Sequence, residues 1–379
     1  MQVSQIYNLV NTAAQAVAGE IALPSEDLSN LVDVGKSIAN AQGTEQFYKA
    51  LVDRIGKMYF VDRKYTGLLL KLFKDSWQFG SIVGKVQVDD MDVTQNDTWD
   101  IINGASYDPF VVNLPLVSSK FFNKMATFEL DITTPTKQIE QSFTSVDEMN
   151  RFLSMVQTMV YNSMETRIEA CAFRALDNMM AATIDANGAS VIHLLTTYNT
   201  ITGITLTAEK ALVDEDFLRW SSKILGLYKK RLAARTSIYN LAGKRRFTPA
   251  ERLHVVVLAD YAEAVKNTAY SVTYNEEFIK LPAYEEVPFW QAPGTSFALA
   301  DVSGLDVTAI VDDAGTTKAV SQAYIVATMF DDEAVGVLQP RKRVTTQYNP
   351  KNETYNDFHK WESRYYNDFQ EQCLVFVLD

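Results

Sequence analysis

The chain has 379 residues, of which 47% are hydrophobic and 22% charged, and its formal charge is −12. This composition excludes a disordered, collagen-like or disulfide-framework protein. The acidity argues against a protein whose main task is to grip phosphates, because such proteins are usually basic. The start of the chain lacks the pattern of a signal peptide, and no stretch reaches the roughly 20 apolar residues of a membrane span. We therefore expect a folded protein that is made, and at least initially kept, in the cytoplasm.

Residues 1–59 are predicted to form an N-terminal arm with short helical pieces. The strongest of these runs from Thr44 to Tyr59. Its apolar side chains recur at helical spacing at Phe47, Leu51, Ile55 and Met58.

Residues 60–144 show the pattern of strands around a long polar loop. A first strand is indicated by alternation at Ile82, Gly84, Val86 and Val88. Further strands are predicted at Phe110–Val117 and Met125–Ile132. Between them, Asp89–Asp108 is polar and rich in turn residues, and a loop of this length inside a domain usually projects or carries function. This region is therefore predicted to be a β-arm that reaches away from the body.

Residues 145–184 contain the clearest element, a helix predicted to run without a break over 145–182. Ser145 and Glu148 form a capping box at its start. An apolar stripe follows from Met149 to Met179, and no glycine or proline occurs before Gly188. Such a length is typical of a strut across a domain.

Residues 185–330 alternate helices and strands, which predicts one α/β subdomain. After a Gly/Thr-rich passage, Asp214 opens an amphipathic helix, and Leu253–Leu258 reads as a strand buried on both faces. A helix is predicted at Ala259–Val265. Further strands are expected at Phe297–Ala300, Val307–Val311 and Tyr324–Met329.

Residues 331–379 are predicted to be β-rich. Strands are expected at Val335–Leu338 and Val344–Tyr348, followed by a turn over residues 349–352. A further strand covers Tyr355–Tyr366. The apolar run Cys373–Leu378 predicts a buried closing strand, so that the C-terminus is anchored.

The sequence offers no catalytic motif, and no enzyme, cofactor or metal site is predicted. The three histidines, His193, His254 and His359, are isolated, and neither cysteine belongs to a CxxC pair. Gly80–Lys85 resembles a phosphate loop but has the wrong glycine spacing. The aspartates at 89, 90, 92 and 97 could surround a divalent cation, although a solvated loop tip is the preferred interpretation.

Two basic clusters are candidates for subunit contact. The first contains Lys229, Lys230, Arg231 and Arg235, followed by Lys244, Arg245 and Arg246. A contact with an acidic face of a neighbouring subunit is favoured for it, ahead of a solvated helix end and of nucleic acid. The second cluster, Arg341–Arg343, lies in a β segment, where salt links between subunits are expected.

The order of the predicted elements resembles the HK97-like capsid fold of tailed bacteriophages. Several segments are similar to the major capsid proteins of phi29-like, short-tailed phages: Leu51–Gly56, Val160–Ser163, Arg364–Asp368 and Leu374–Val377. The resemblance implies an α+β fold with an N-arm (1–59), an extended β-hairpin called the E-loop with adjoining P-domain strands (60–144), a spine helix (145–184), an α/β A domain (185–330) and closing P-domain strands (331–379).

The resemblance also implies a function and partners. The chain would assemble into pentamers and hexamers of an icosahedral shell around phage DNA, and its E-loop, Val86–Val117, would lie across a neighbour. A separate scaffolding protein, a portal, decoration or head-fibre proteins and non-specifically contacted double-stranded DNA would be its partners, with no membrane. The shell would form in the host cytoplasm and become the virion. An encapsulin-type protein compartment is the alternative.

Twelve residues are predicted to contact other subunits on this reading. They are Lys85, Asp89, Asp90, Asp92, Trp99, Lys229, Lys230, Arg231, Arg245, Arg246, Arg341 and Arg343.

Overall fold

The computed structural model describes residues 63–74, 83–89, 102–135, 146–272, 282–291 and 297–379, together with residues 91, 93, 95, 96 and 99. The chain divides into two units. One comprises Met1–Arg63 and Asp147–Val156, and the other comprises Lys64–Val146 and Gln157–Asp379. The second unit holds both sheets and both hairpins. The predicted N-terminal arm, with its helix Thr44–Tyr59, lies outside the described residues.

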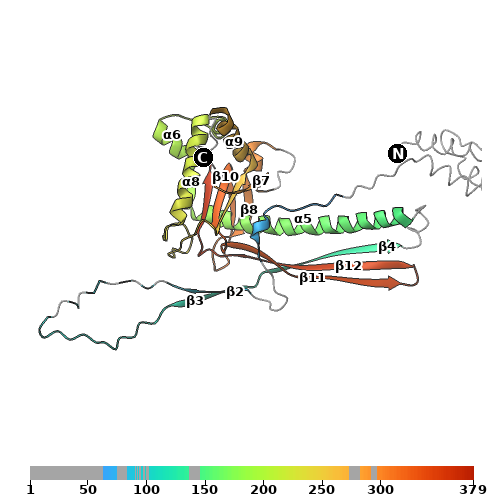
Figure 1. The fold of residues 1–379 in the computed structure, drawn as a ribbon, viewed down its shortest axis with the longest axis horizontal. Coiled ribbons are helices and arrows are strands. Elements are labelled where there is room, and N and C mark those ends of the chain that lie inside the picture. Colours follow the sequence, from blue (N-terminus) through green and yellow to red (C-terminus); the bar gives the residue numbers. More distant parts are fainter. Residues whose placement is uncertain are drawn as a thin grey trace, which may run out of the picture. The chain divides into compact units, whose positions relative to one another are not determined.

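The long helix is confirmed. Helix α5 runs unbroken from Val146 to Ala186, which is 41 residues or about 60 Å at 1.5 Å per residue (Figure 1). Its second half is the buried half: Ile168, Leu176 and Met180 are almost fully covered. The predicted capping box lies outside the described side chains. The apolar stripe was long enough for the sequence alone to define this element.

A five-stranded sheet forms the centre of the second unit. Its strand order is β5 (Val191–His193), β13 (Cys373–Val377), β10 (Ile325–Asp331), β6 (Leu253–Leu258) and β7 (Glu285–Val287). The β5–β13 and β6–β7 pairs are parallel and the two central pairs are antiparallel. The predicted closing strand is therefore confirmed, and it pairs with β5 and β10 rather than with the strands that precede it directly, β11 (Val335–Asn349) and β12 (Thr354–Asn367). The domain boundaries themselves stay a prediction.

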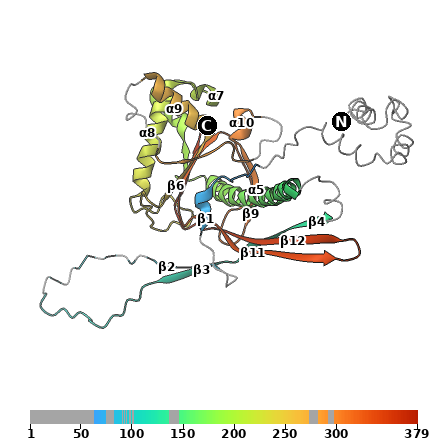
Figure 2. The same ribbon diagram turned by 45° about the vertical axis from the view of Figure 1, so that its right-hand side comes forward.

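Both faces of this sheet are covered, as the sequence of β6 predicts. Val256 and Leu258 belong to the same buried cluster as Leu176 and Met180 of α5. The alternate residues of β6 join a second cluster with α6 (Leu194–Thr202), α8 (Glu215–Leu232) and α9 (Ala259–Val272). Helix α8 begins where predicted, since the Asp214 carboxylate accepts from the Phe217 amide at 2.7 Å. The layers can be followed in Figure 2.

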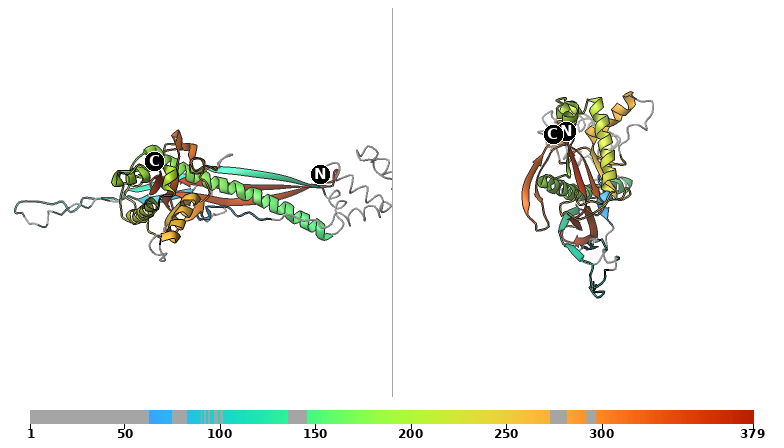
Figure 3. Two further views of the ribbon diagram at one scale, coloured as in Figure 1. Left: turned by 90° about the horizontal axis from the view of Figure 1, so that it is seen from above. Right: turned by 90° about the vertical axis from the view of Figure 1, so that its left-hand side faces the viewer.

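A second, four-stranded sheet has the order β1 (Phe73–Lys74), β11 (Val335–Asn349), β12 (Thr354–Asn367) and β4 (Met125–Pro135). Figure 3 shows its three long strands side by side. The two strands predicted at Val335–Leu338 and Val344–Tyr348 are one strand, β11, with a register shift between Leu338 and Arg341. Phe128 of β4 packs against Trp361 of β12 with the two rings tilted, and it lies under the Arg167 guanidinium of α5.

Two hairpins complete the strands: β2 (Val83–Val88) with β3 (Val117–Phe122), and β8 (Leu305–Ile310) with β9 (Thr317–Gln322). The 3₁₀ turn Leu70–Leu72 and the short helices α7 (Ala208–Ala211) and α10 (Leu299–Val302) fill the connections. Within the described residues, no helix is both long and apolar enough to cross a membrane.

Two predictions in these regions were wrong. The strand expected at Phe110–Val117 starts only at Val117, because β2 ends opposite that residue and leaves the preceding segment without a hydrogen-bonding partner. The strand expected at Phe297–Ala300 is helix α10, since a short apolar run with alanine and leucine suits either structure. The Gly/Thr-rich passage contains β5 and α6, which its sequence did not indicate.

Candidate subunit interface

The hairpin of β2 and β3 turns most of its polar side chains toward its own chain and most of its apolar side chains outward. The half-buried positions of β2 and β3 are Val83, Lys85, Gln87, Ser118, Lys120 and Phe122. The exposed positions are Gly84, Val86, Val88, Val117, Ser119 and Phe121. Phe121 is 69% exposed. An ordinary half-buried strand buries its apolar face, so this hairpin presents a surface suited to another molecule.

A cluster of ion pairs holds the inward face of the hairpin. Lys85 and Lys120 are directly opposite each other in the β2–β3 register. Both reach Asp368, whose side chain is fully buried: the Lys85 Nζ donates to Oδ2 and the Lys120 Nζ to Oδ1, each at 2.8 Å. Lys85 also donates to Glu371 at 2.6 Å. Two like charges across a hairpin repel, and the shared carboxylate offsets this repulsion.

Two further carboxylates, which are more exposed than Asp368, pair with the same lysines on the solvent side of the cluster. Glu333 lies 3.1 Å from the Lys85 ammonium, and Asp313 lies 2.7 Å from that of Lys120. The hairpin is thus bound to the turn after β10, the turn between β8 and β9, and the turn before β13. Because these turns belong to different elements, the cluster fixes the direction in which the hairpin leaves the body.

The charges of the cluster shift the pKa values of its members. Burial raises the pKa of Asp368, but the nearby ammonium groups of Lys85 and Lys120 lower it by more, and the net shift is downward. Burial lowers the pKa of Lys85, and its pairs with Asp368 and Glu371 more than reverse that effect. Both groups therefore remain charged over the whole physiological pH range.

Aromatic packing supports the hairpin beside the ion cluster. The ring of Phe122 in β3 lies 5.1 Å from that of Tyr366 in β12, centroid to centroid. Gly336 is opposite Tyr366 in the sheet, and a Cβ at this position would come within 2.5 Å of the Tyr366 ring. Glycine here leaves room for the ring, and burial raises the pKa of the Tyr366 hydroxyl to about 12.

The outer end of the hairpin is held by the second half of the first basic cluster. The Lys244 ammonium donates to the buried Asp89 carboxylate at 2.6 Å. The Arg246 guanidinium donates to the Gln87 side chain and lies 3.7 Å from Glu371. These contacts lie within the chain, whereas Asp89 and Arg246 were predicted to contact other subunits.

Beyond this point lies a segment that we call the acidic arm, Asp89–Leu116. At its base the Asp89 amide donates to the Leu116 carbonyl at 2.8 Å. Its described apolar side chains are largely exposed, reaching 99% for Val93 and 84% for Trp99 and Phe110. So much exposed apolar surface on one segment marks an interaction site.

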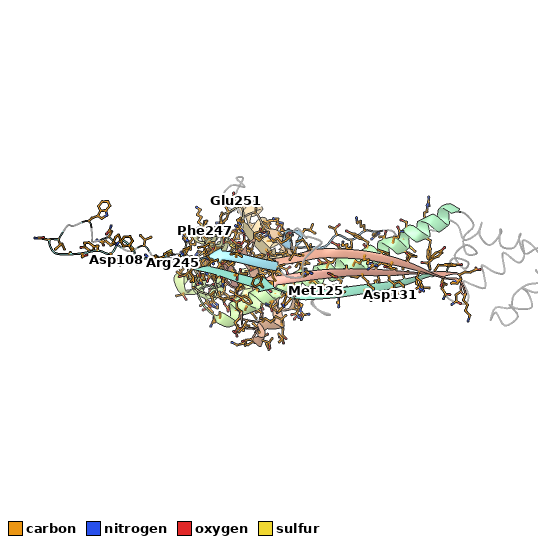
Figure 4. The ribbon with its side chains drawn as sticks, turned by 90° about the horizontal axis from the view of Figure 1, so that it is seen from below. Asp108, Met125, Asp131, Arg245, Phe247 and Glu251 are labelled. Atoms are coloured by element: carbon orange, nitrogen blue, oxygen red, sulfur yellow. The ribbon has the colours of Figure 1, made fainter. Side chains whose placement is uncertain are left out.

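The other predicted contact residues differ in their surroundings. Lys230 and Arg231 are exposed at the end of α8, where Arg231 lies over the Tyr228 ring, and Lys229 is half-buried beside them. Arg245 follows in the segment after α8 (Figure 4). Arg343 is exposed on β11. Asp90, Asp92 and the side chain of Arg341 lie outside the described residues, so the alternative of a cation site at the aspartates stays a prediction.

Sequence reasoning selected Lys85 but missed Lys120, Asp368 and Glu371. Asp368 lies 283 residues from Lys85 along the chain, and no local pattern connects them. One signal was available. A lysine and a glutamine alternate with valines in β2, so one face of this strand is polar, and a polar face needs a partner inside the chain or water.

A comparison with protein families decides what the chain is. The family model of Phi29-like phage major capsid proteins matches residues 8–377. The chain belongs to this family. It is a phage major capsid protein, and it forms the capsid shell of the virion. The match decides against the encapsulin alternative. A search of curated protein sequences found no match.

Solved structures agree with the fold expected of a capsid protein. A chain in the capsid structure of Staphylococcus phage Andhra is 8% identical, with a TM-score of 0.59 over 86% of this chain and 87% of that one. A chain from the structure of the head fibre and inner core protein of native bacteriophage P68 is 9% identical, with a TM-score of 0.56 over 86% and 88%. These likenesses establish the HK97-like fold.

Proposed function

We propose that the capsid protein joins its neighbours through the β2–β3 hairpin and the acidic arm, which lie across the adjacent subunit as an E-loop. The observation that carries this proposal is that the hairpin buries its polar face and exposes its apolar face. Its polar face is held by Asp368 and Glu371 of its own chain, and its apolar face, with Val86 and Phe121, is exposed. Covering that face with a second subunit removes apolar surface from water, which stabilises the contact by about 25 cal/mol for each Å² buried.

The proposal extends to the assembly as a whole. Subunits form pentamers and hexamers of an icosahedral shell in the host cytoplasm, guided by a separate scaffolding protein. A portal and decoration or head-fibre proteins join the shell. Packaged double-stranded DNA is enclosed and contacted non-specifically, and the net charge of −12 is compatible with a shell that does not grip the DNA tightly. The chain acts mechanically and without catalysis.

The basic end of α8 has a place in the same proposal. Lys230 and Arg231 are exposed, and a cluster of exposed cations attracts the carboxylates of a partner. We propose that they, with Lys229 and Arg245, contact an adjacent subunit. The same role is proposed for Arg341 and Arg343 of β11.

Negative-stain microscopy of the purified protein, expressed with and without its candidate scaffolding partner, tests the assembly. Closed shells or rings of capsomer size are expected. A uniform population of small monomers in both preparations would contradict the proposal.

Deletion of Asp89–Asp108 tests the role of the acidic arm. The subunit should stay soluble and folded, because Lys85 and Lys120 remain bound to Asp368, but shell formation should be lost. A variant in which the same positions are replaced by a glycine–serine segment of equal length separates the chemistry of the arm from its length. Normal shells from both variants would exclude Asp89–Asp108 from assembly.

A further inference from the structure

The four-stranded sheet has two long outer edges that could accept another strand. On one side, β11 pairs with β1 only at Val337 and Leu338. From Lys342 to Asn349 it pairs with β12 alone, and no described strand lies along its other edge. On the opposite side, β12 is the only described strand that pairs with β4 over its whole length. Open edges of this length readily pair with another chain.

Charge distinguishes the two edges. Strand β11 contains three cations, Arg341, Lys342 and Arg343, and no carboxylate. Strand β4, along which Met125 and Asp131 are labelled in Figure 4, contains Glu129 and Asp131 and no cation. An acidic strand is therefore attracted to the edge of β11 and repelled from that of β4.

The acidic arm contains a candidate strand that is itself uncharged and follows directly after the aspartates of the arm, the last of which is Asp108. Asp89–Leu116 has six aspartates and no lysine, arginine or glutamate. Within it, Phe110–Leu114 has the residue types of a strand and is bounded by Pro109 and Pro115. No strand includes this segment in the single chain. Phe110 is 84% and Val112 is 78% exposed, so both backbone and side chains are accessible.

The side chains of the two segments also match. In a strand, Phe110, Val112 and Leu114 share one face. On β11, Val344 and Tyr348 share a face, and Tyr348 lies against Tyr355 of β12 with ring centroids 4.9 Å apart. All of these apolar side chains are exposed in the single chain: Phe110, Val112, Leu114, Val344, Tyr348 and Tyr355. Pairing the segments would place one apolar row beside the other.

We propose that Phe110–Leu114 of one subunit adds as a strand to the outer edge of β11, Lys342–Asn349, of a second copy of this chain. The inference rests on the proposed function, since it names the surface on which the acidic arm lies. Backbone hydrogen bonds provide the attachment. The apolar rows set which face of the arm turns toward Tyr348. Lys342 and Arg343 attract the aspartates that precede the added strand, such as Asp108.

Cysteine pairs in assembled shells test this contact. Val112→Cys is combined in turn with Val344→Cys, Thr346→Cys and Tyr348→Cys, three positions on one face of β11, so that the result does not depend on the register. Mild oxidation should produce covalent oligomers from at least one pair, because neighbouring strands bring Cβ atoms within disulfide reach. The matched control pairs Val112→Cys with Val213→Cys, an exposed valine before α8, and should give none.

The single variant Val112→Cys is the control for disulfides with the native thiols, the half-buried Cys171 and the buried Cys373. Shells that form normally but give no covalent oligomer from any of the three pairs would overturn the contact and leave the proposed function standing. Failure of the unaltered chain to form shells would instead overturn the proposed function.

Hydrogen exchange on the unaltered protein gives a second measurement, independent of any variant. The amides of Phe110–Leu114 and of β11 beyond Lys342 should both exchange more slowly in shells than in free subunits. Unchanged exchange in either segment would contradict strand addition, even where cysteine variants fail to assemble.

Discussion

The β2–β3 hairpin and the five-stranded sheet bury opposite kinds of side chain. In β6, both alternating rows are apolar and both are buried, one against α5 and the other against α8 and α9. In the hairpin, the row held against the body consists largely of polar side chains and the apolar row is exposed. The sheet therefore completes its core within one chain, whereas the hairpin completes its apolar contacts only in an assembly.

This contrast has an energetic consequence. Removing apolar surface from the sheet should cost stability of the subunit itself. Removing it from the exposed row of the hairpin or from the acidic arm should cost mainly assembly, because these side chains have little covered surface to lose in the single chain. Variants in the two regions should thus separate folding from assembly.

The largest effect is expected from a core substitution. Phe376 is fully buried, with its ring 5.7 Å from that of Tyr228. Phe376→Ala should lower the free energy of unfolding by about 3–5 kcal/mol, since it removes a buried ring and leaves a cavity. The matched variant Phe110→Ala should change it by no more than about 0.5 kcal/mol but reduce the yield of shells. Urea unfolding measures the free energy of unfolding and microscopy the yield of shells. An equal loss of stability in the two variants would contradict the contrast between the sheet and the arm.

A smaller effect is expected at the ion cluster. Asp368→Ala leaves Lys85 and Lys120 without the carboxylate that they share, and should destabilise the subunit by about 3 kcal/mol, at the lower end of the cost of breaking a buried pair. Glu129→Ala is the control, because its pair with Lys360 is half exposed and contributes at most about 1 kcal/mol. Similar losses in both variants would show that burial does not strengthen the cluster.

The smallest effect concerns pH. The pKa of Asp368 is lowered in the folded chain, so its contribution is complete above its ordinary value of 3.8 and is lost as pH falls through the lowered pKa. The pKa of Lys85 is raised, so its contribution is complete below 10.5 and is lost as pH rises through the raised pKa. The stability difference between the native chain and Asp368→Asn should therefore be flat from about pH 4 to 10. A slope near pH 7 would contradict this assignment.

Much of the fold could be predicted from the sequence, since its main elements have local signals. The apolar stripe of α5 continues for many turns, Asp214 caps α8, and β6 is apolar on both faces. Each pattern follows from the period of a helix or a strand and needs no knowledge of distant residues. Short segments were less certain, as the helix Leu299–Val302 in place of a strand shows.

The candidate interface could be predicted only in part, for the same reason. The polar loop and the alternating residues of β2 are local sequence patterns, and they were sufficient to predict a projecting β-arm. Which face of β2 lies inward depends on Asp368 and Glu371, far along the chain.

By itself, the sequence therefore determined the type and order of the main elements and the resemblance to capsid proteins, because residue spacing and composition act over short distances. Only the tertiary structure decided that Lys85, Lys120 and Asp368 meet, that the closing strand Cys373–Val377 enters the five-stranded sheet, and that the apolar face of the hairpin is left open. Ion pairs and strand partners join residues hundreds of positions apart, and their choice depends on how the whole chain buries its charges and its backbone hydrogen-bonding groups.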